Sequence, residues 1–335
     1  MRRPVFYSLL LATACLLVLL LMTGQQASAN SNENCGCHAI KSEGPFVHKP
    51  VLDGACLSCH KPTGEKHPHF KKGAFTLTDN GKAGLCNECH ERKNFMKYVH
   101  GPVASGDCLA CHDIHQSDNK TQLKAPGSQI CYKCHTKAKF DRKYPHPPIA
   151  EGKCTGCHDP HQSNVKYLLK GDGVDLCYLC HNKDMFQGKS VHKPITQGNC
   201  SACHSTHGTE YIHLLKNNYT DEIYMPYNKA NFAICFDCHN KDLADDLRTD
   251  TETNFRNGMI NIHYIHINKT AKGRACKVCH DPHAAAQARL ISERIPGFGK
   301  WRIPILFTKT DTGGTCVVGC HKPKSYDRIN PVVNP

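Results

Sequence analysis

Residues 191–207 read VHKPITQGNCSACHSTH, and this order of histidine, proline, glycine and paired cysteines recurs along the chain. Residues 99–115 read VHGPVASGDCLACHDIH, and residues 145–161 read PHPPIAEGKCTGCHDPH. In each copy one histidine lies eight residues before the first cysteine, and another lies three residues after the C-x-x-C-H motif. Self-similarity of this kind indicates a repeated structural unit.

A plainer C-x-x-C-H motif follows each copy, so that the full repeat holds two motifs. Five such repeats are predicted, at residues 48–90, 100–135, 146–181, 192–239 and 263–321. The fourth carries an insertion near residues 217–231, and the fifth carries one near residues 284–315 that holds Trp301. The first departs from the pattern, with CHKPTGEKHPH in place of the compact C-H-x-x-H.

The chain has 335 residues, 23 cysteines and 24 histidines. Every cysteine except Cys15 belongs to nine C-x-x-C-H motifs, to the longer variant CVVGCH at 316–321, or to the shorter variant CGCH at 35–38. C-x-x-C-H is the signature of covalent c-type haem attachment. The thiols bond the two vinyl groups of the porphyrin, and the adjacent histidine binds the iron.

A histidine directly after the second cysteine is not required by a zinc site or a redox cysteine pair. The motifs therefore predict haem rather than zinc or disulfides. The predicted attachment residues are Cys56, Cys59, Cys86, Cys89, Cys108, Cys111, Cys131, Cys134, Cys154, Cys157, Cys177, Cys180, Cys200, Cys203, Cys235, Cys238, Cys276, Cys279, Cys316 and Cys320. The predicted proximal ligands are His60, His90, His112, His135, His158, His181, His204, His239, His280 and His321.

The two variant motifs differ in what they predict. A loop absorbs the extra residue of CVVGCH, so we count it as a haem site. In CGCH the thiols of Cys35 and Cys37 are closer together, and His38 follows them. Two interpretations of this motif stay open. It binds an eleventh haem through one or two thioethers, or it is a haem-free remnant or a local disulfide. The expected cofactor is thus haem c, with ten or eleven copies.

The other histidines supply enough second axial ligands for all ten irons. Eight recur in register with the motifs, either eight residues before a first cysteine or three residues after a motif histidine. One of His67 and His69 and one of His263 and His266 complete the set, and we select His67 and His266. The predicted distal ligands are His48, His67, His100, His115, His146, His161, His192, His207, His266 and His283.

Methionine is the rival axial ligand, and it would raise the reduction potential. Beyond residue 29 the chain has only Met96, Met185, Met225 and Met259, none of them at a repeating position. Low-spin, low-potential bis-histidine haems are therefore expected.

The N-terminal 29 residues have the features of a secretory signal. Arg2 and Arg3 precede an apolar run, and Ala27 and Ala29 form an A-x-A-like cleavage site. The alternative is an uncleaved anchor. No later segment approaches the roughly 20 apolar residues of a membrane span. The chain is therefore expected in the periplasm, at the outer membrane or outside the cell.

The composition predicts few short helices, extensive loops and little or no β-sheet around a haem chain, in one elongated domain over residues 30–335. The mean hydropathy is −0.49. With about 30 residues per haem, the haem rings must supply the apolar interior. Burial of apolar surface contributes roughly 25 cal/mol per Å² to stability. The formal charge of +13 would suggest nucleic-acid binding. Haem propionates offset this charge, so no nucleic-acid partner is expected.

With this register, residues 35–321 resemble the doubled-CXXCH multihaem c-type cytochromes. They are most similar to the decahaem electron conduits of metal-reducing bacteria and to pentahaem relatives that feed periplasmic nitrite reductase. The resemblance implies an extended haem wire, with redox protein donors and acceptors. It further implies an outer-membrane porin and another multihaem cytochrome as partners. The process that it implies is extracellular or metal-oxide respiration.

Three functions compete on the sequence alone. The first is an electron carrier without enzymatic activity. The second is a subunit of an extracellular cytochrome filament, which needs ligands shared between subunits. The third is a reductase, which needs an open iron, and the C-x-x-C-K motif of known catalytic haems does not occur. The regular motif spacing favours the first.

Overall fold

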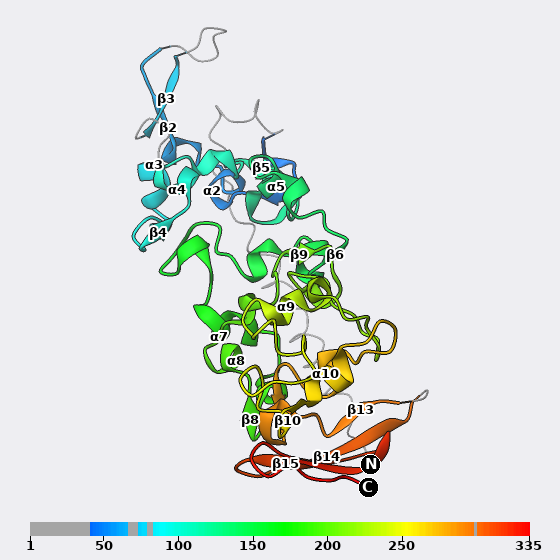
Figure 1. The fold of residues 1–335 in the computed structure, drawn as a ribbon. Coiled ribbons are helices and arrows are strands. Elements are labelled where there is room, and N and C mark those ends of the chain that lie inside the picture. The colour runs from blue at the N-terminus through cyan, green and yellow to red at the C-terminus, as the bar shows by residue number, and fades with distance from the viewer. Residues whose placement is uncertain (1–40, 66–72, 79–82, 298–299) are drawn as a thin grey trace, which may run out of the picture. The chain divides into compact units, whose positions relative to one another are not determined.

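The computed structural model describes residues 41–65, 73–78, 83–297 and 300–335 (Figure 1). The chain divides into two compact units, Met1–Asn94 with Gly101–Ile130 and Phe95–His100 with Cys131–Pro335. This division runs through the second repeat. The predicted signal segment, the CGCH motif and His67 lie outside the described residues, and those predictions stay predictions.

The helices are short, as expected for a chain of frequent prolines and glycines. Several begin directly after an upstream histidine of the repeat, which takes an extended conformation before a helix with proline in its first turn. The helices are α2 (Lys49–Leu52), α3 (Ala83–Asn87), α4 (Gly101–Ala104), α5 (Gln129–Tyr132), α6 (Pro147–Ala150), α7 (Gly173–Tyr178), α8 (Lys193–Thr196), α9 (Ala233–Phe236) and α10 (Ile262–Ile267).

A glycine ends each of the turns α2, α4, α6 and α8 in the left-handed conformation. The φ angles are +70° at Gly54, +76° at Gly106, +67° at Gly152 and +65° at Gly198. Glycine adopts this conformation without the steric cost that a Cβ brings. The chain then reverses directly into a 3-10 turn over the C-x-x-C residues, as at Cys56–Ser58 and Cys154–Gly156. The H-x-P…G-x-C spacing thus encodes a compact turn between the upstream histidine and the motif.

Two-stranded antiparallel sheets join successive repeats. In each of four sheets, the residues before an upstream histidine pair with the residues after the C-H-x-x-H of the next repeat, and His48 N bonds His115 O at 2.8 Å. These pairs are β1 (Phe46–Val47) with β5 (Gln116–Ser117), β4 (Tyr98–Val99) with β7 (Gln162–Ser163), β6 (Tyr144–Pro145) with β9 (Gly208–Thr209), and β8 (Ser190–Val191) with β12 (Ala284–Ala285).

Two further small sheets lie outside this scheme. In the first repeat, β2 (His60–Pro62) pairs with β3 (Phe75–Leu77), and in the fifth, β10 (Arg256–Asn257) pairs with β11 (Ile260–Asn261). The expectation of short helices and many loops is therefore confirmed. The expectation of little or no β-sheet is not confirmed, because main-chain pairing between repeats satisfies backbone groups that short helices leave unbonded.

The insertion in the fifth repeat forms the largest sheet of the described residues, with four antiparallel strands (Figure 1). Its last hairpin carries the CVVGCH motif, with Cys316 in one strand, Gly319 and Cys320 in the turn, and His321 in the next strand. The extra residue is accommodated by this hairpin turn. The strands are β13 (Arg294–Pro296), β14 (Arg302–Lys309), β15 (Gly313–Val318) and β16 (His321–Asp327).

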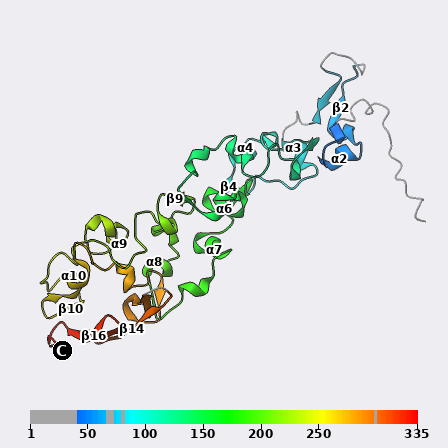
Figure 2. The ribbon, with the colours of Figure 1, turned by 90° about the vertical axis from the view of Figure 1, so that its right-hand side faces the viewer.

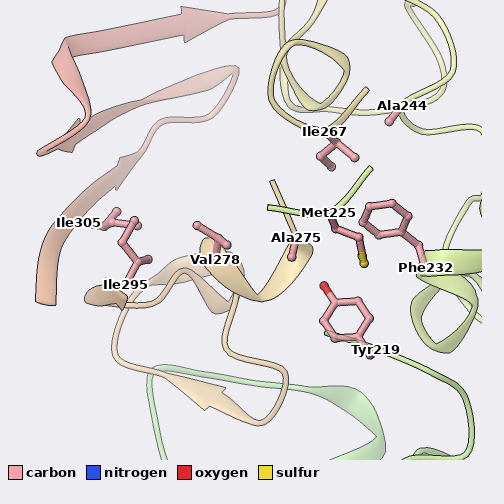
Figure 3. Packing of buried hydrophobic residues seen from close by; sticks show 9 residues of the cluster. All are labelled: Tyr219, Met225, Phe232, Ala244, Ile267, Ala275, Val278, Ile295 and Ile305. Carbon is pink, nitrogen blue, oxygen red and sulfur yellow. The ribbon is translucent and has the colours of Figure 1, made fainter. Parts of the chain in front are cut away.

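Among the residues that the structure describes, a cluster of buried hydrophobic side chains forms in and between the two insertions, from Tyr219 to Ile305. Figure 3 shows its nine buried residues, which include Tyr219, Phe232 and Ile305. Phe232 has no exposed surface. Among the described residues before Tyr219, only Ala74 and Ala125 are buried hydrophobic residues. The repeats themselves are thus not held by apolar side chains.

This core supports α10 and the sheet that follows it. Figure 2 shows α10 and β10 near β14 and β16, and β10 contacts both α10 and β16. The fully buried Asn261 caps α10, since its Oδ1 accepts the Tyr264 N–H at 3.2 Å. Its Nδ2 donates to Leu243 O and Asp246 O at 2.9 and 3.0 Å. The position of α10 is therefore tightly fixed.

We predict that Gly54→Ala lowers the free energy of unfolding of the holoprotein by about 1–2 kcal/mol, the cost of a left-handed non-glycine residue. No atom lies within 4 Å of the added Cβ, so the backbone conformation is the sole cause. Gly156→Ala is the matched control, because Gly156 has open space and no positive φ, and Ala110 occupies the same place in another motif. Chemical denaturation followed by circular dichroism measures both, and equal losses would contradict the argument.

Candidate haem-binding sites

One turn of helix fixes the first cysteine and the histidine of most motifs on the same side of the chain. The N–H of the motif histidine donates to the carbonyl of the first cysteine, four residues earlier, at 2.9 Å in His90 and 3.1 Å in His158. The same bond forms at His112, His135, His181, His204, His239 and His280. A thiol and an imidazole on one face are what attachment to a porphyrin edge and ligation of its iron require.

Most motif histidines face a second histidine across a gap that matches one iron. With metal–nitrogen bonds of about 2 Å and about 1.2 Å from nitrogen to ring centre, two imidazoles on opposite sides of an iron have ring centres about 6.4 Å apart. Seven nearly parallel pairs have ring centres 5.8 to 6.2 Å apart: His48–His90, His60–His115, His100–His135, His146–His181, His158–His207, His192–His239 and His204–His283. The donor set therefore fits bis-histidine haem.

These pairs follow two rules that the sequence did not reveal. An upstream histidine faces the second motif of its own repeat, as His146 faces His181. A C-H-x-x-H histidine faces the first motif of the preceding repeat, as His207 faces His158 and His283 faces His204. The pairing of histidines between neighbouring repeats thus has a defined direction for these pairs.

The fifth repeat uses a different arrangement, in which one helix serves two motifs. His266 of α10 lies 6.4 Å from His321, ring centre to ring centre. His263, one turn earlier, is close enough to His280 to interact with it electrostatically. The selection of His266 is therefore supported, but His263 was left out of the predicted set. His263 lies thirteen residues and His266 ten residues before Cys276, so neither follows the eight-residue register, and only one of the two was selected.

Backbone carbonyls set the tautomer of many of these histidines. The Nδ1 atoms of the upstream residues His48, His100, His146 and His192 lie 2.9 to 3.1 Å from the carbonyls of Ile114, Pro160, Thr206 and Pro282. A carbonyl only accepts, so Nδ1 carries the proton and Nε2 keeps a free lone pair. Metal-bound histidines use their second nitrogen in this way.

Burial keeps several of the candidate ligands neutral. Burial, with smaller contributions from the neighbouring His280 and His266, lowers the pKa of His263 to about 3. Burial also lowers the pKa of His146, His207, His239 and His283. Neutral imidazole is the form that binds a metal. Among the described residues, no three His, Cys, Asp or Glu side chains converge on a point that would hold a bare metal ion.

The leftover histidine His213 has a partner of another kind. Its Nε2 lies 2.8 Å from Asp221 Oδ2, and Asp221 also pairs with Lys277. Asp221 thus joins the insertion of the fourth repeat both to His213 and to the motif at Cys276. His112 and His161 each make a hydrogen bond that involves a backbone carbonyl. His112 Nδ1 lies 2.9 Å from Thr121 O, and the carbonyl of His161 accepts from His100 N at 2.9 Å.

Cysteines of successive motifs lie side by side. Hydrogen bonds join the thiols of Cys86 and Cys108, of Cys177 and Cys200, and of Cys235 and Cys276. Burial and then the adjacent Cys108 raise the pKa of the Cys86 thiol to about 11. Four further pairs are close enough to interact electrostatically: Cys59 with Cys89, Cys157 with Cys177, Cys203 with Cys238, and Cys279 with Cys316.

We predict that His207→Gly opens the iron bound by His158. The share of the spectrum that belongs to one haem becomes high-spin and binds carbon monoxide, because the remaining histidine occupies a single axial position. His213→Asn is the control, since His213 contacts Asp221 and asparagine tolerates its left-handed backbone. EPR and carbon monoxide difference spectra measure both, and a low-spin His207→Gly protein would exclude this pairing.

Comparison with known proteins agrees with these sites. The family model "Doubled CXXCH motif" matches residues 48–95, 100–140, 146–186 and 192–244, more than half of the chain. The multihaem cytochrome MtrA of Shewanella baltica is 27% identical over 103 residues, which cover 28% of this chain and 30% of that protein. The match therefore spans less than a third of the curated relative. By its motifs, its facing histidines and this match, the chain belongs to the doubled CXXCH family and is a multihaem c-type cytochrome that transfers electrons.

Proposed function

We propose that the chain is an electron carrier without enzymatic activity, in which electrons pass along a row of ten bis-histidine haems. The bound haems supply the Fe(III)/Fe(II) couple. The neighbouring cysteines carry this proposal, because each sulfur marks the edge of one haem. They link the motifs in chain order, from Cys56 through Cys86 to Cys108 in one unit and from Cys154 to Cys316 in the other.

The paired histidines support a carrier over a reductase. An iron with imidazole on both faces has no position left for a substrate, and seven motifs have stacked partners. The tenth motif faces His266. The filament alternative needs ligands shared between subunits, for which His38, His69 and His213 are spare; of these, His213 is hydrogen-bonded to Asp221, and the other two lie outside the described residues.

We place this carrier in the periplasm or at the outer membrane, in a relay between redox proteins. The signal predicted over residues 1–29 and the resemblance to decahaem conduits support this location. A porin and a second multihaem cytochrome are the partners that the resemblance implies. Within the residues that the structure describes, no helix is long and apolar enough to cross a membrane.

The haem count and the state of the irons are tested together on the secreted holoprotein. We expect an intact mass that contains ten haems, with only low-spin signals in the EPR spectrum. An eleventh haem at CGCH adds one further mass step, which a Cys35→Ser/Cys37→Ser variant removes. A high-spin signal that shifts with added nitrite would contradict the carrier proposal and favour a reductase.

The row is tested by removing one haem from its interior or from its end. Cys200→Ala/Cys203→Ala deletes an interior haem, and Cys316→Ala/Cys320→Ala deletes the last one. After a reducing pulse that adds less than one electron per protein, we expect the electron to equilibrate over all haems as one population in the parent and in the end variant. In the interior variant, the haems before and after the deleted one are expected to form two populations that exchange electrons slowly. Equal kinetics in both variants would sink the proposal that electrons follow chain order.

A further inference from the structure

Four loops of the chain hold two successive residues in the left-handed conformation. They are Thr121–Gln122, Tyr167–Leu168, His213–Leu214 and Arg289–Leu290, with φ angles from 53° to 62°. These eight are the only non-glycine residues with positive φ in the part of the chain that the structure describes. Each loop occupies the same position, nine and ten residues after the first motif histidine of its repeat.

The loops place a carbonyl against that motif histidine. Nδ1 of His112, His158, His204 and His280 lies 2.9, 2.9, 2.8 and 3.0 Å from the carbonyl oxygen of Thr121, Tyr167, His213 and Arg289 respectively. The carbonyl of the second left-handed residue accepts the N–H that follows the histidine, as Leu168 O accepts from Asp159 N at 2.8 Å. Both carbonyls therefore point back toward the motif.

This conformation is sterically costly for residues that carry a Cβ. Such strain persists only where the surroundings impose it, and it concentrates at functional positions. The residues at the first position, Thr121, Tyr167, His213 and Arg289, share no side-chain chemistry. The common element is the direction of the backbone carbonyl.

We propose that these left-handed loops position the proximal histidine and lower the reduction potential of the haem that it binds. The carbonyl fixes the proton on Nδ1, leaves Nε2 aimed at the iron, and makes the imidazole a stronger donor. Hydrogen bonding around an axial ligand is one of the means by which a protein sets the potential of a haem. The proposal rests on haem binding alone, whichever route the electrons take.

The first repeat provides the comparison within the chain. Its motif histidine His60 pairs with Leu77, as His158 pairs with Leu169, but here the two segments are the extended strands β2 and β3. Thr76 thus stands in the place of Leu168, with an extended rather than a left-handed backbone. Valine introduced at each of the two positions separates the effect of the left-handed backbone from the effect of a β-branched side chain.

The test is Leu168→Val, with Leu168→Gly as rescue and Thr76→Val as matched control. A β-branched residue resists positive φ, and φ at residue 168 orients the peptide that carries the Tyr167 carbonyl. In a spectroelectrochemical titration of the holoprotein, we expect the share of absorbance of one haem to move to a more positive potential in Leu168→Val. Leu168→Gly and Thr76→Val are expected to titrate like the parent.

Two results would overturn the proposal. One is a Leu168→Val titration equal to that of the parent, and the other is an equal shift in Leu168→Val and Leu168→Gly. Intact mass covers the case in which the haem is not attached. If Leu168→Val lacks one haem and Leu168→Gly keeps it, the positioning role is supported. If both variants lack one haem, the positioning role is refuted.

Discussion

Two imidazoles must meet across one iron, and most of the local structure follows from this constraint. The histidines of a pair are far apart in the chain or belong to different repeats, so the backbone must hold each one independently. Proline and glycine fix the turn between an upstream histidine and its neighbouring motif. Main-chain pairing, such as that of β6 with β9, then fixes the repeats to each other. The repeats need little apolar core because their rigidity comes from turns and ligands.

The sequence predicted the chemistry better than the connectivity. Motif spacing predicted the attachment cysteines and the proximal histidines, and register predicted most of the histidines that the structure places opposite a motif histidine. The partner of each histidine was not predictable, because His207 and His158 meet through the pairing of two-residue strands. Such strands are too short for a periodic hydrophobic pattern. The four-stranded sheet was missed because the insertion near 284–315 was treated as an interruption of the repeat.

His263 illustrates the limit of reasoning from register. Where the repeat is regular, position relative to the motif is enough to select a ligand. In the fifth repeat the half-buried helix α10 replaces the proline turn, and Asn261 and the apolar core determine where its histidines lie. Two sources of order therefore meet in this chain, with haem ligation in the regular repeats and side-chain packing around the insertions.

The direction of ligand sharing has a consequence for how such a protein changes in length. At the joints formed by His60 with His115, by His158 with His207 and by His204 with His283, a repeat relies on its C-terminal neighbour for a ligand. Duplicating an interior repeat preserves this arrangement. Truncating the chain after an interior repeat would remove the histidine that faces the first motif of that repeat. In the fifth repeat, His263 lies near His280 of the same repeat and takes the place that a histidine of the next repeat takes at the regular joints. The regular joints can therefore be multiplied without new contacts, whereas the fifth repeat depends on its own helix and apolar core.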